Sequence, residues 1–229
     1  MIFRPKNKQD HFPDIIINGS KITKVDKAKF LGVIIDNKLT WNHHINHIAK
    51  KISKGTGIII KARKYFNTTT LANLYNTLIL PYISYGIHVW GTAANIHLDK
   101  ILVRQKKIVR IISGVPPRTH TKPLFKDLKL MTIHQIYTYY VGVFMYNLYH
   151  EKLPSIFGMF QRTSHVHSYP TRQQCSYYIQ KDSTVRTEKT IRISGPKTWN
   201  SIIKHVDINC KIGSYKTNIK KFILSNEYY

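Results

Sequence analysis

The spacing of apolar residues changes after about residue 40, and this change constrains the fold more than any other feature of the sequence. Before it, short runs alternate polar and apolar side chains, as half-buried strands do. After it, apolar residues recur every three or four positions, which places them on one face of a helix. The sequence therefore predicts a mainly α-helical chain that begins with a small antiparallel β element.

The N-terminal region contains three candidate strands. Asp14 to Ile17 and Lys21 to Val25 flank Asn18-Gly19, and Asn-Gly between two such runs is the strongest short signal for a hairpin. Phe30 to Ile35 is a third, more continuously apolar run that ends at a turn over residues 36–38. Two or three strands are too few to be stable alone, so they need another surface to pack against.

Three helices joined by short connections are predicted to form an antiparallel bundle. The first has about 24 residues, between a candidate N-cap at Thr40 and a break at Asn67. The second, Thr70–Gly91, is apolar on most sides, so it is expected to be buried and to bend at Pro81. The third, Leu98–Ile112, has one buried side, formed by Leu98, Ile101, Gln105, Ile108 and Ile112.

A second α-rich region is expected after Gly114 and Pro116-Pro117, which end the third helix. Its predicted helices are 123–128, 132–150, 199–205 and 214–224, with loops and short strands over 158–190. The long helix 132–150 is apolar at Ile133, Ile136, Tyr140, Val143, Phe144 and Leu148. The proposed divisions are 1–40 for the β element, 41–115 for the bundle and 116–229 for the α-rich region.

The charge is strongly unbalanced, with 36 Lys and Arg against 11 Asp and Glu, a formal charge of +25. Because 42% of the 229 residues are hydrophobic, the chain can form a core and is not a disordered basic tail. Nucleic acid is the first partner to consider for such a surplus, before an acidic protein or an acidic membrane surface. No acidic residue lies between Asp36 and Asp99.

Basic residues on the first and third helices are the predicted contacts to nucleic-acid backbone. They are Lys50, Lys51, Lys54, Lys61, Arg63, Lys64, Lys100, Arg104, Lys107 and Arg110. Such side chains supply affinity and position without reading sequence. For each of them the alternative is a solvated basic face that has no ligand. Trp41, Tyr75, Tyr82, Tyr85 and Trp90 are expected in the core rather than as stacking platforms, and Trp199 is expected to anchor the C-terminal region.

No motif for catalysis is present in the sequence. The acidic residues are scattered, without the close pair that two-metal phosphoryl transfer needs. There is no nucleophile elbow, phosphate-binding loop or dinucleotide fingerprint. His43 and His47, with His44 between them, and His165 with His167 lack a nearby Cys or acidic third ligand. We therefore expect no catalytic residue, metal or cofactor in this chain, and exposed histidines at the start of the first helix.

The remaining features predict a soluble, intracellular protein that keeps its thiols reduced. Two cysteines, Cys175 and Cys210, are too few for a disulfide scaffold, and the N-terminus has no apolar segment of a signal peptide. The most apolar stretch, 71–90, is interrupted by polar residues and Pro81, so no membrane association is expected. The sequence does not distinguish nucleus from cytoplasm.

Several motifs in order resemble the reverse transcriptases of non-LTR retrotransposons (LINE, jockey-like). Residues 30–45 are similar to the family pattern F/Y-L-G-V-x-I/L-D-x-x-L-x-W-x-x-H-I. Residues 74–91 resemble L-Y-x-x-L-I-x-P-x-x-x-Y-G…W-G, and 105–112 resemble Q-K-x-x-x-R-x-I. Further landmarks of the family's C-terminal region are similar at 120–125, 153–154, 169–172 and 195–200.

The resemblance implies a role as well as a fold. Phe30, Leu31 and Gly32 would form the primer-grip turn, 41–115 the thumb, and 116–229 the C-terminal region. In such enzymes the aspartates that bind the metal ions precede the segment matched here. The resemblance thus implies a fragment of an RNA-directed DNA polymerase without its catalytic aspartates. Mg would act only in the intact parent, and the partners would be primer–template nucleic acid and the missing fingers and palm.

Two interpretations remain open. The chain is either such a fragment, inactive alone and able at most to bind nucleic acid, or an independent cationic nucleic-acid-binding module recruited by a host. An independent module should be monodisperse without a palm, whereas a fragment should aggregate through its exposed strands.

Overall fold

The computed structural model describes residues 1–3, 14–166, 175–179 and 190–225, although not the side chains of His165 and Val166. His167 and the landmark at 169–172 lie outside the described residues. The chain is mainly α-helical with antiparallel β pairs at its N-terminus, as predicted. Among the described residues, no helix combines the length and the apolar character needed to cross a bilayer.

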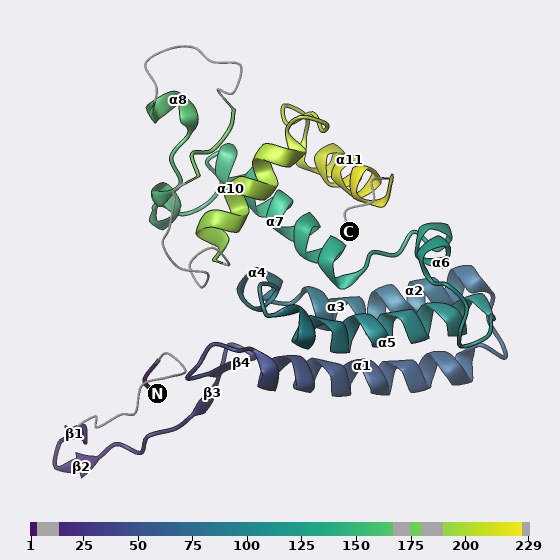
Figure 1. Ribbon diagram of the computed structural model, residues 1–229, viewed down its shortest axis with the longest axis horizontal. Helices are drawn as coiled ribbons and strands as arrows, with labels where there is room; N and C mark the ends of the chain where they lie inside the picture. Colours follow the sequence, from purple (N-terminus) through teal and green to yellow (C-terminus); the bar gives the residue numbers. More distant parts are fainter. Residues whose placement is uncertain (4–13, 167–174, 180–189, 226–229) are drawn as a thin grey trace.

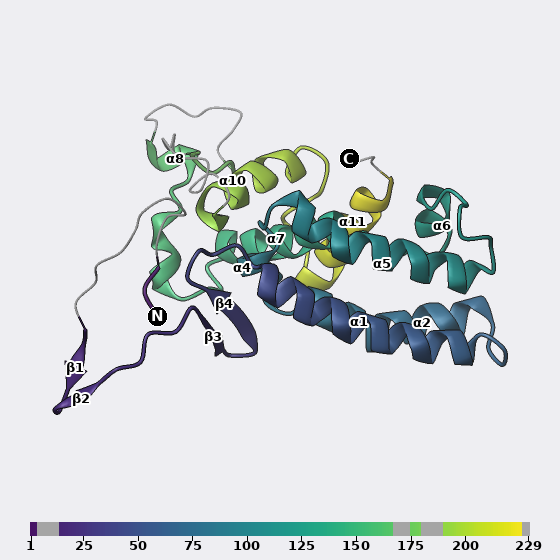
Figure 2. The same ribbon diagram turned by 60° about the horizontal axis from the view of Figure 1, so that its bottom comes forward.

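Two small hairpins precede the helices. β1 (Ile16–Ile17) pairs with β2 (Ser20–Lys21), and the intervening Asn18-Gly19 has positive φ at both residues, so the predicted hairpin is confirmed. It extends away from the remaining elements in both views (Figures 1 and 2). Ile16 is 64% exposed and Ile17 is 56% exposed. This hairpin therefore presents an uncovered apolar strip.

The second hairpin differs from the single strand expected over Phe30 to Ile35. β3 (Lys27–Phe30) pairs with β4 (Val33–Asp36), and the chain reverses at Leu31-Gly32, where φ is 44° and 82°. The continuous-strand prediction is wrong because Gly32 permits a left-handed turn in the middle of the apolar run. A turn at this position is what the resemblance to reverse transcriptases implies.

The first helix, α1 (Asn42–Ala62), confirms the predicted helix, but its start differs from the prediction. The N-cap is Trp41, with φ of 63°, and not Thr40. Thr40 does not act as the N-cap because its backbone amide, like that of Trp41, donates a hydrogen bond to the Asp36 carboxylate. At the other end, Asn67 caps the next helix by accepting from the Thr70 amide, which explains the break expected there.

The second predicted helix is divided into three: α2 (Thr68–Leu78), α3 (Leu80–Ser84) and α4 (Ile87–Trp90). Pro81 lies in the first turn of α3, where its missing amide is tolerated, and Gly86 turns the chain with φ of 61°. One stripe is fully buried across all three helices, and Leu74, Leu78 and Leu80 are half-buried against the core. Tyr82, Tyr85 and Val89 are exposed, so the expected burial is confirmed for one side of the segment and is wrong for the other. The stripe consists of Leu71, Tyr75, Ile79, Ile83, Ile87 and Trp90.

The third bundle helix, α5 (Asn95–Ser113), buries the five residues that the sequence placed on its inner side and ends at Gly114. A short helix, α6 (Lys122–Asp127), follows, and then the long helix α7 (Ile133–Tyr149), whose Thr132 and Gln135 form a capping box. All three confirm the predicted helices. The buried residues of α7 include Val141, Met145 and Tyr146, outside the stripe expected from the sequence, because α7 is packed on two sides.

Four short or medium-length elements follow α7 in the described residues. They are the 3₁₀ helix η1 (Ser155–Met159), α8 (Thr163–Val166), α10 (Ile191–Ile202) and α11 (Ile212–Ser225). Two of them, α10 and α11, pack against α7. The expected start of a helix at Trp199 is wrong, since α10 begins eight residues earlier and continues through Gly195 and Pro196, which are buried against α7. Trp199 is fully buried, as expected, and donates its indole N–H to the Cys175 carbonyl.

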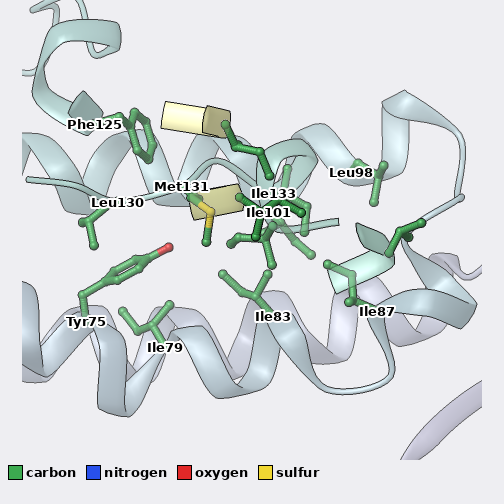
Figure 3. Close-up of a cluster of buried hydrophobic side chains, with 14 of the residues drawn as sticks. Tyr75, Ile79, Ile83, Ile87, Leu98, Ile101, Phe125, Leu130, Met131 and Ile133 are labelled. Carbon is green, nitrogen blue, oxygen red and sulfur yellow. The ribbon is translucent and has the colours of Figure 1, made fainter. Parts of the chain in front are cut away.

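The elements form three levels in Figure 1. The bundle of α1, α2 and α5 lies at the bottom, α7 crosses above it, and α10 and α11 lie above α7. α7 packs against α3, α4 and α5 on one side and against α10 and α11 on the other. Figure 3 shows side chains from α2, α3, α5, α6 and α7 meeting in one apolar cluster. The core is therefore continuous from the bundle into the C-terminal region.

A polar side chain lies in the middle of this core. Gln105 of α5 is fully buried, and its amide nitrogen donates to the Tyr75 hydroxyl (2.7 Å) and to the Met131 carbonyl (3.1 Å). Its amide oxygen accepts from the Ile133 backbone amide at 2.8 Å. One side chain thus joins α5, α2 and the first residue of α7, and satisfies a backbone donor that the start of a helix leaves unpaired.

Replacing Gln105 with Leu should strongly destabilise the fold. The substitution leaves a buried hydroxyl, a carbonyl and an amide without partners, at a cost of about 1–3 kcal/mol for each group that stays unpaired. We expect the free energy of unfolding, measured by urea denaturation, to fall by about 3 kcal/mol. Gln161→Leu, at an exposed position, is the matched control and should change it by less than about 0.5 kcal/mol. Equal effects of the two variants would contradict this role.

Candidate nucleic-acid interface

The tip of the β3–β4 hairpin is held by the junction between α3 and α4. The Tyr85 hydroxyl donates to the Leu31 carbonyl at 2.7 Å. Gly86 lies directly beside Val33, and a Cβ added to Gly86 would lie 3.2 Å from Val33 Cγ2. Positive φ at Gly86 and the close approach of Val33 both favour glycine. Two motifs separated by about fifty residues therefore meet at this contact.

The base of the hairpin is fixed by Asp36, which is buried. Its carboxylate accepts hydrogen bonds from the backbone amides of Lys38, Thr40 and Trp41 and from the Thr40 hydroxyl. Burial by itself would raise the pKa of Asp36, but these hydrogen bonds together outweigh it and lower the pKa below its ordinary value. The ionised carboxylate thus organises the turn that leads from β4 into α1.

His44 connects the hairpin to α1 from inside. Its Nδ1 accepts from the Ile34 amide of β4 at 3.2 Å, and its ring packs edge-on against Trp90, with centroids 5.5 Å apart. Nε2 is buried without a hydrogen-bond partner. Burial, assisted by nearby His47, lowers the pKa of His44 to about 4. The prediction of exposed histidines is therefore wrong for His44, because β4 covers that side of α1.

A basic groove lies between the hairpin and the helices α1 and α5, with a volume of about 710 Å³. We call it the hairpin groove. Its charged and titratable lining residues come from three segments: Lys27 and Lys29 from β3, His43, His47 and Lys50 from α1, and Arg104 from α5. None of the described residues that line it is acidic. The groove therefore concentrates positive charge at one concave surface.

The structure brings some of the predicted contact residues to this groove or to its margin. Lys50 and Arg104 line it. Lys54 and Lys61 follow Lys50 at helical spacing along the same edge of α1 and are exposed. Lys64 is also exposed, but it lies in the turn after the end of α1. On α5, Lys100 and Arg104 are fixed in place, whereas Lys107, at the next position on that edge, is exposed.

Hydrogen bonds across the α1–α5 contact hold these cations. Lys100 Nζ donates to the side-chain oxygens of Asn42 (2.8 Å) and Asn46 (3.1 Å). Arg104 donates to the Lys100 carbonyl at 2.7 Å and to the Ser53 hydroxyl at 3.4 Å. The two helices thus fix two cations relative to each other at the margin of the groove.

Three predicted contact residues lie elsewhere. Lys51 is on another side of α1, with its amine 5.7 Å from the centre of the Tyr82 ring. Arg110 donates to the Thr119 carbonyl at 2.8 Å and so stabilises the loop after α5. Arg63 is the C-cap residue of α1.

The sequence analysis missed the contribution of the hairpin. Lys27 and Lys29 are two residues apart on β3, and this spacing places both side chains on one face of a strand. The alternation was present in the sequence, but no strand was expected over residues 27–30, so these lysines were not assigned to a face. Phe30, Leu31 and Gly32 lie at the exposed tip of the hairpin, and their role as a primer grip stays a prediction.

The expectation for the aromatic residues is confirmed in part. Tyr75 and Trp90 are buried and Trp41 is half-buried. Tyr82 and Tyr85 are 44% and 56% exposed, so the expectation is wrong for these two. They are exposed because the helix divides at Pro81 and Gly86, and only one stripe of it reaches the core.

Carboxylate, cysteine and imidazole side chains do not gather into a metal site in the part of the chain that the structure describes. No group of three such side chains there could hold an ion. His43 and His47 share the groove with lysines and an arginine, which disfavour a bound cation. The donor set that a Mg²⁺ ion prefers is therefore not assembled by the described residues.

Comparison with known proteins identifies the relatives of this chain. It is 33% identical over 128 residues to the RNA-directed DNA polymerase from mobile element jockey of Drosophila melanogaster, and 35% identical over 125 residues to that of Drosophila funebris. It is 27% identical over 124 residues to a probable RNA-directed DNA polymerase from transposon X-element of Drosophila melanogaster. The chain is similar to a part of these jockey-type polymerases.

The relationship covers a limited part of each protein. The matches span 53–54% of this chain and 14% of the length of each of these polymerases. No protein-family model matches the sequence, and no solved structure matches it. The resemblance found in the motifs is thus confirmed at the level of the family, as similarity to a part of a jockey-type polymerase.

The pKa of His44 predicts how stability depends on pH. Because its pKa falls from about 6.5 in the unfolded chain to about 4 in the folded one, protonation favours unfolding. The contribution of neutral His44 is complete above about pH 6.5 and is lost as the pH falls toward 4. We expect the pH dependence of the free energy of unfolding in this window to be weaker in His44→Leu. His43→Gln, at an exposed position, should retain the wild-type dependence, and a loss in both variants would contradict the assignment.

Proposed function

We propose that the hairpin groove binds the sugar–phosphate backbone of primer–template nucleic acid, as part of an RNA-directed DNA polymerase. The observation that supports this most directly is the convergence of cations from β3, α1 and α5 on one concave surface without a described acidic lining residue. Backbone phosphates are the ligands that such a surface favours. The relationship to jockey-type polymerases supports nucleic acid over other polyanions.

The length of the basic edge fits a duplex. From His43 to Lys61, α1 advances by about 27 Å at 1.5 Å per residue. This distance corresponds to about eight nucleotides of one strand at 3.4 Å each. Lys50, Lys54 and Lys61 lie along this edge and are exposed. A duplex placed along α1 would therefore meet cations over most of one helical turn.

The chemistry of these contacts favours binding that is independent of sequence. Lysine amines act as point charges toward phosphates, and they do not impose the forked geometry by which arginine recognises a base edge. Arg104 is held by hydrogen bonds to Lys100 and Ser53, so part of its donor capacity is already used. A polymerase thumb has to hold every sequence that it copies, and backbone contacts meet this requirement.

Catalysis itself is assigned to a part of the polymerase other than this segment. Asp36 lies close to the groove, but its oxygens accept hydrogen bonds from the turn into α1. The fingers and palm would supply the metal-binding carboxylates and would cover the apolar strip of β1–β2 and the exposed tip at Phe30 and Leu31. Alone, this chain binds primer–template and does not extend it.

Charge reversal in the groove tests the proposal. Lys29→Glu combined with Lys50→Glu should reduce the slope of log affinity against log salt by about 1.8 for duplex DNA, since each phosphate contact contributes about 0.9. Lys197→Glu combined with Lys216→Glu makes the same change in net charge at exposed positions on α10 and α11 and should leave the slope within about 0.5 of wild type. Fluorescence anisotropy between 50 and 300 mM salt measures both. Equal changes in the two pairs would assign binding to net charge and not to the groove.

Primer extension tests the assignment of catalysis. The full chain, incubated with an RNA template, a DNA primer, nucleotides and Mg²⁺, should give no product above the background without protein. Product above that background would contradict the assignment and would show that the chain itself holds a polymerase site.

A further inference from the structure

A second pocket opens on the side of α5 that faces away from the hairpin groove. Leu102 and Lys106 line it from α5, α6 and its flanking residues form a second wall, and the start of α7 and the end of α11 complete it. Its volume is about 510 Å³, within the range of about 300–1,000 Å³ typical of small-molecule sites. It shares no lining residue with the hairpin groove. We call it the α5–α6 pocket.

Basic side chains surround this pocket. Lys106, His120, Lys122, Lys126 and His134 line it, and none of the described lining residues is acidic. Burial lowers the pKa of His134, opposed in part by the charge of Asp99, so this imidazole is neutral at pH 7. The positive charge at the rim is therefore carried by the lysines, with Asp99 as the acidic neighbour that faces His134.

Three backbone amides at the start of α7 are already paired within the protein. The Thr132 amide donates to the side chain of Gln135, and the Gln135 amide donates to the side chain of Thr132. The Ile133 amide donates to the Gln105 oxygen. Since the capping box and Gln105 occupy these three groups, the lysine side chains at the rim are the main donors for an anion in the pocket.

The inner wall of the pocket is apolar. Phe125 and Leu130 line this wall, and both also belong to the core cluster shown in Figure 3. Leu102 and Leu224 are half-buried and extend the apolar wall toward solvent. A ligand with an anionic group and an apolar face matches these surroundings, and a nucleotide supplies both in its phosphate and in the face of its base.

The shape of the pocket distinguishes single strands from duplexes. In a duplex the bases are stacked and paired in the interior, and only their edges and the phosphates are accessible. A cavity of this size can hold a base only if that base is unstacked, as in a single strand. The duplex contacts proposed for the hairpin groove do not have this requirement.

From this geometry we infer that the α5–α6 pocket binds one nucleotide of single-stranded RNA or DNA. The base packs against the wall formed by Leu102, Phe125 and Leu130, and its phosphate lies between Lys106 and Lys126. This site is separate from the hairpin groove, and its existence does not depend on the groove binding a duplex.

Photocrosslinking locates the bound base. The full chain is irradiated with a six-nucleotide oligo(dT) that carries one 4-thiothymidine, then digested and sequenced by mass spectrometry. We expect crosslinked peptides to contain residues 102–106 or 121–130. Crosslinks confined to residues 27–50, or spread evenly over the chain, would overturn the inference.

Two variants test the charge and the shape of the pocket separately. Lys106→Glu with Lys126→Glu should weaken binding of the same labelled hexamer by at least about tenfold more than the control pair Lys197→Glu with Lys216→Glu. Leu102→Trp fills the pocket without changing the net charge, and it should reduce the affinity for the hexamer by at least about fivefold. Thermal unfolding shows whether each variant is folded. If Leu102→Trp does not fold, the double variant Lys106→Glu with Lys126→Glu still tests the site. Hexamer binding unchanged in folded pocket variants would overturn the site.

Duplex binding separates this test from that of the proposed function. The pocket variants should bind a duplex of about 12 base pairs like the control pair, while Lys29→Glu with Lys50→Glu should bind the hexamer like the control pair. If the groove variants lose duplex binding and the pocket variants bind the hexamer normally, the groove proposal holds and the pocket inference fails. If instead the pocket variants lose hexamer binding and the groove variants bind the duplex normally, the pocket inference holds and the groove proposal fails.

Discussion

The buried amide of Gln105 is the interaction on which the arrangement of the helices depends. A polar side chain in an apolar core is tolerated only if its hydrogen-bonding groups are satisfied, and Gln105 uses both its oxygen and its nitrogen on groups of three different segments. Apolar burial is non-directional, whereas a hydrogen bond constrains both distance and angle. The directional bonds to Tyr75, Met131 and Ile133 fix the position at which the C-terminal region meets the bundle.

A second group of polar contacts fixes the hairpin and so creates the groove. Asp36, His44 and Tyr85 each bond to backbone groups of the β3–β4 hairpin or of the turn that follows it. A two-stranded hairpin has little stability of its own, and these three anchors hold it against α1 and the α3–α4 junction. Lys27 and Lys29 face Lys50 and Arg104 across one groove because of this attachment.

Basic residues gather on two sides of α5, and the neighbouring elements differ between these two sides. Toward α1, the cations border an open groove, and exposed lysines continue along one edge of α1. Toward α6, they border a smaller pocket with an apolar inner wall. In the two proposals, the same helix serves a paired region of nucleic acid on one side and an unpaired nucleotide on the other, because neighbouring elements give each side a different shape.

The sequence by itself predicted α1 and α5, each from a single apolar stripe, and the existence of the helices α6, α7 and α11. It also determined the first hairpin, since Asn18-Gly19 specifies a turn locally, and it identified the family through its motifs. These features depend on spacing and on neighbours in the chain, which a sequence displays directly. The inner side of α5, including Gln105, was predicted residue by residue for the same reason.

Only the tertiary structure decided how separate segments combine. It divided residues 68–90 into α2, α3 and α4 while keeping one buried stripe, placed the turn at Leu31-Gly32 inside an apolar run, and buried His44 beneath β4. It also selected which cations converge, adding Lys27 and Lys29 and directing Lys51 and Arg110 elsewhere. These outcomes depend on contacts between residues far apart in sequence, and packing and hydrogen bonding across such contacts outweigh local pattern wherever the two differ.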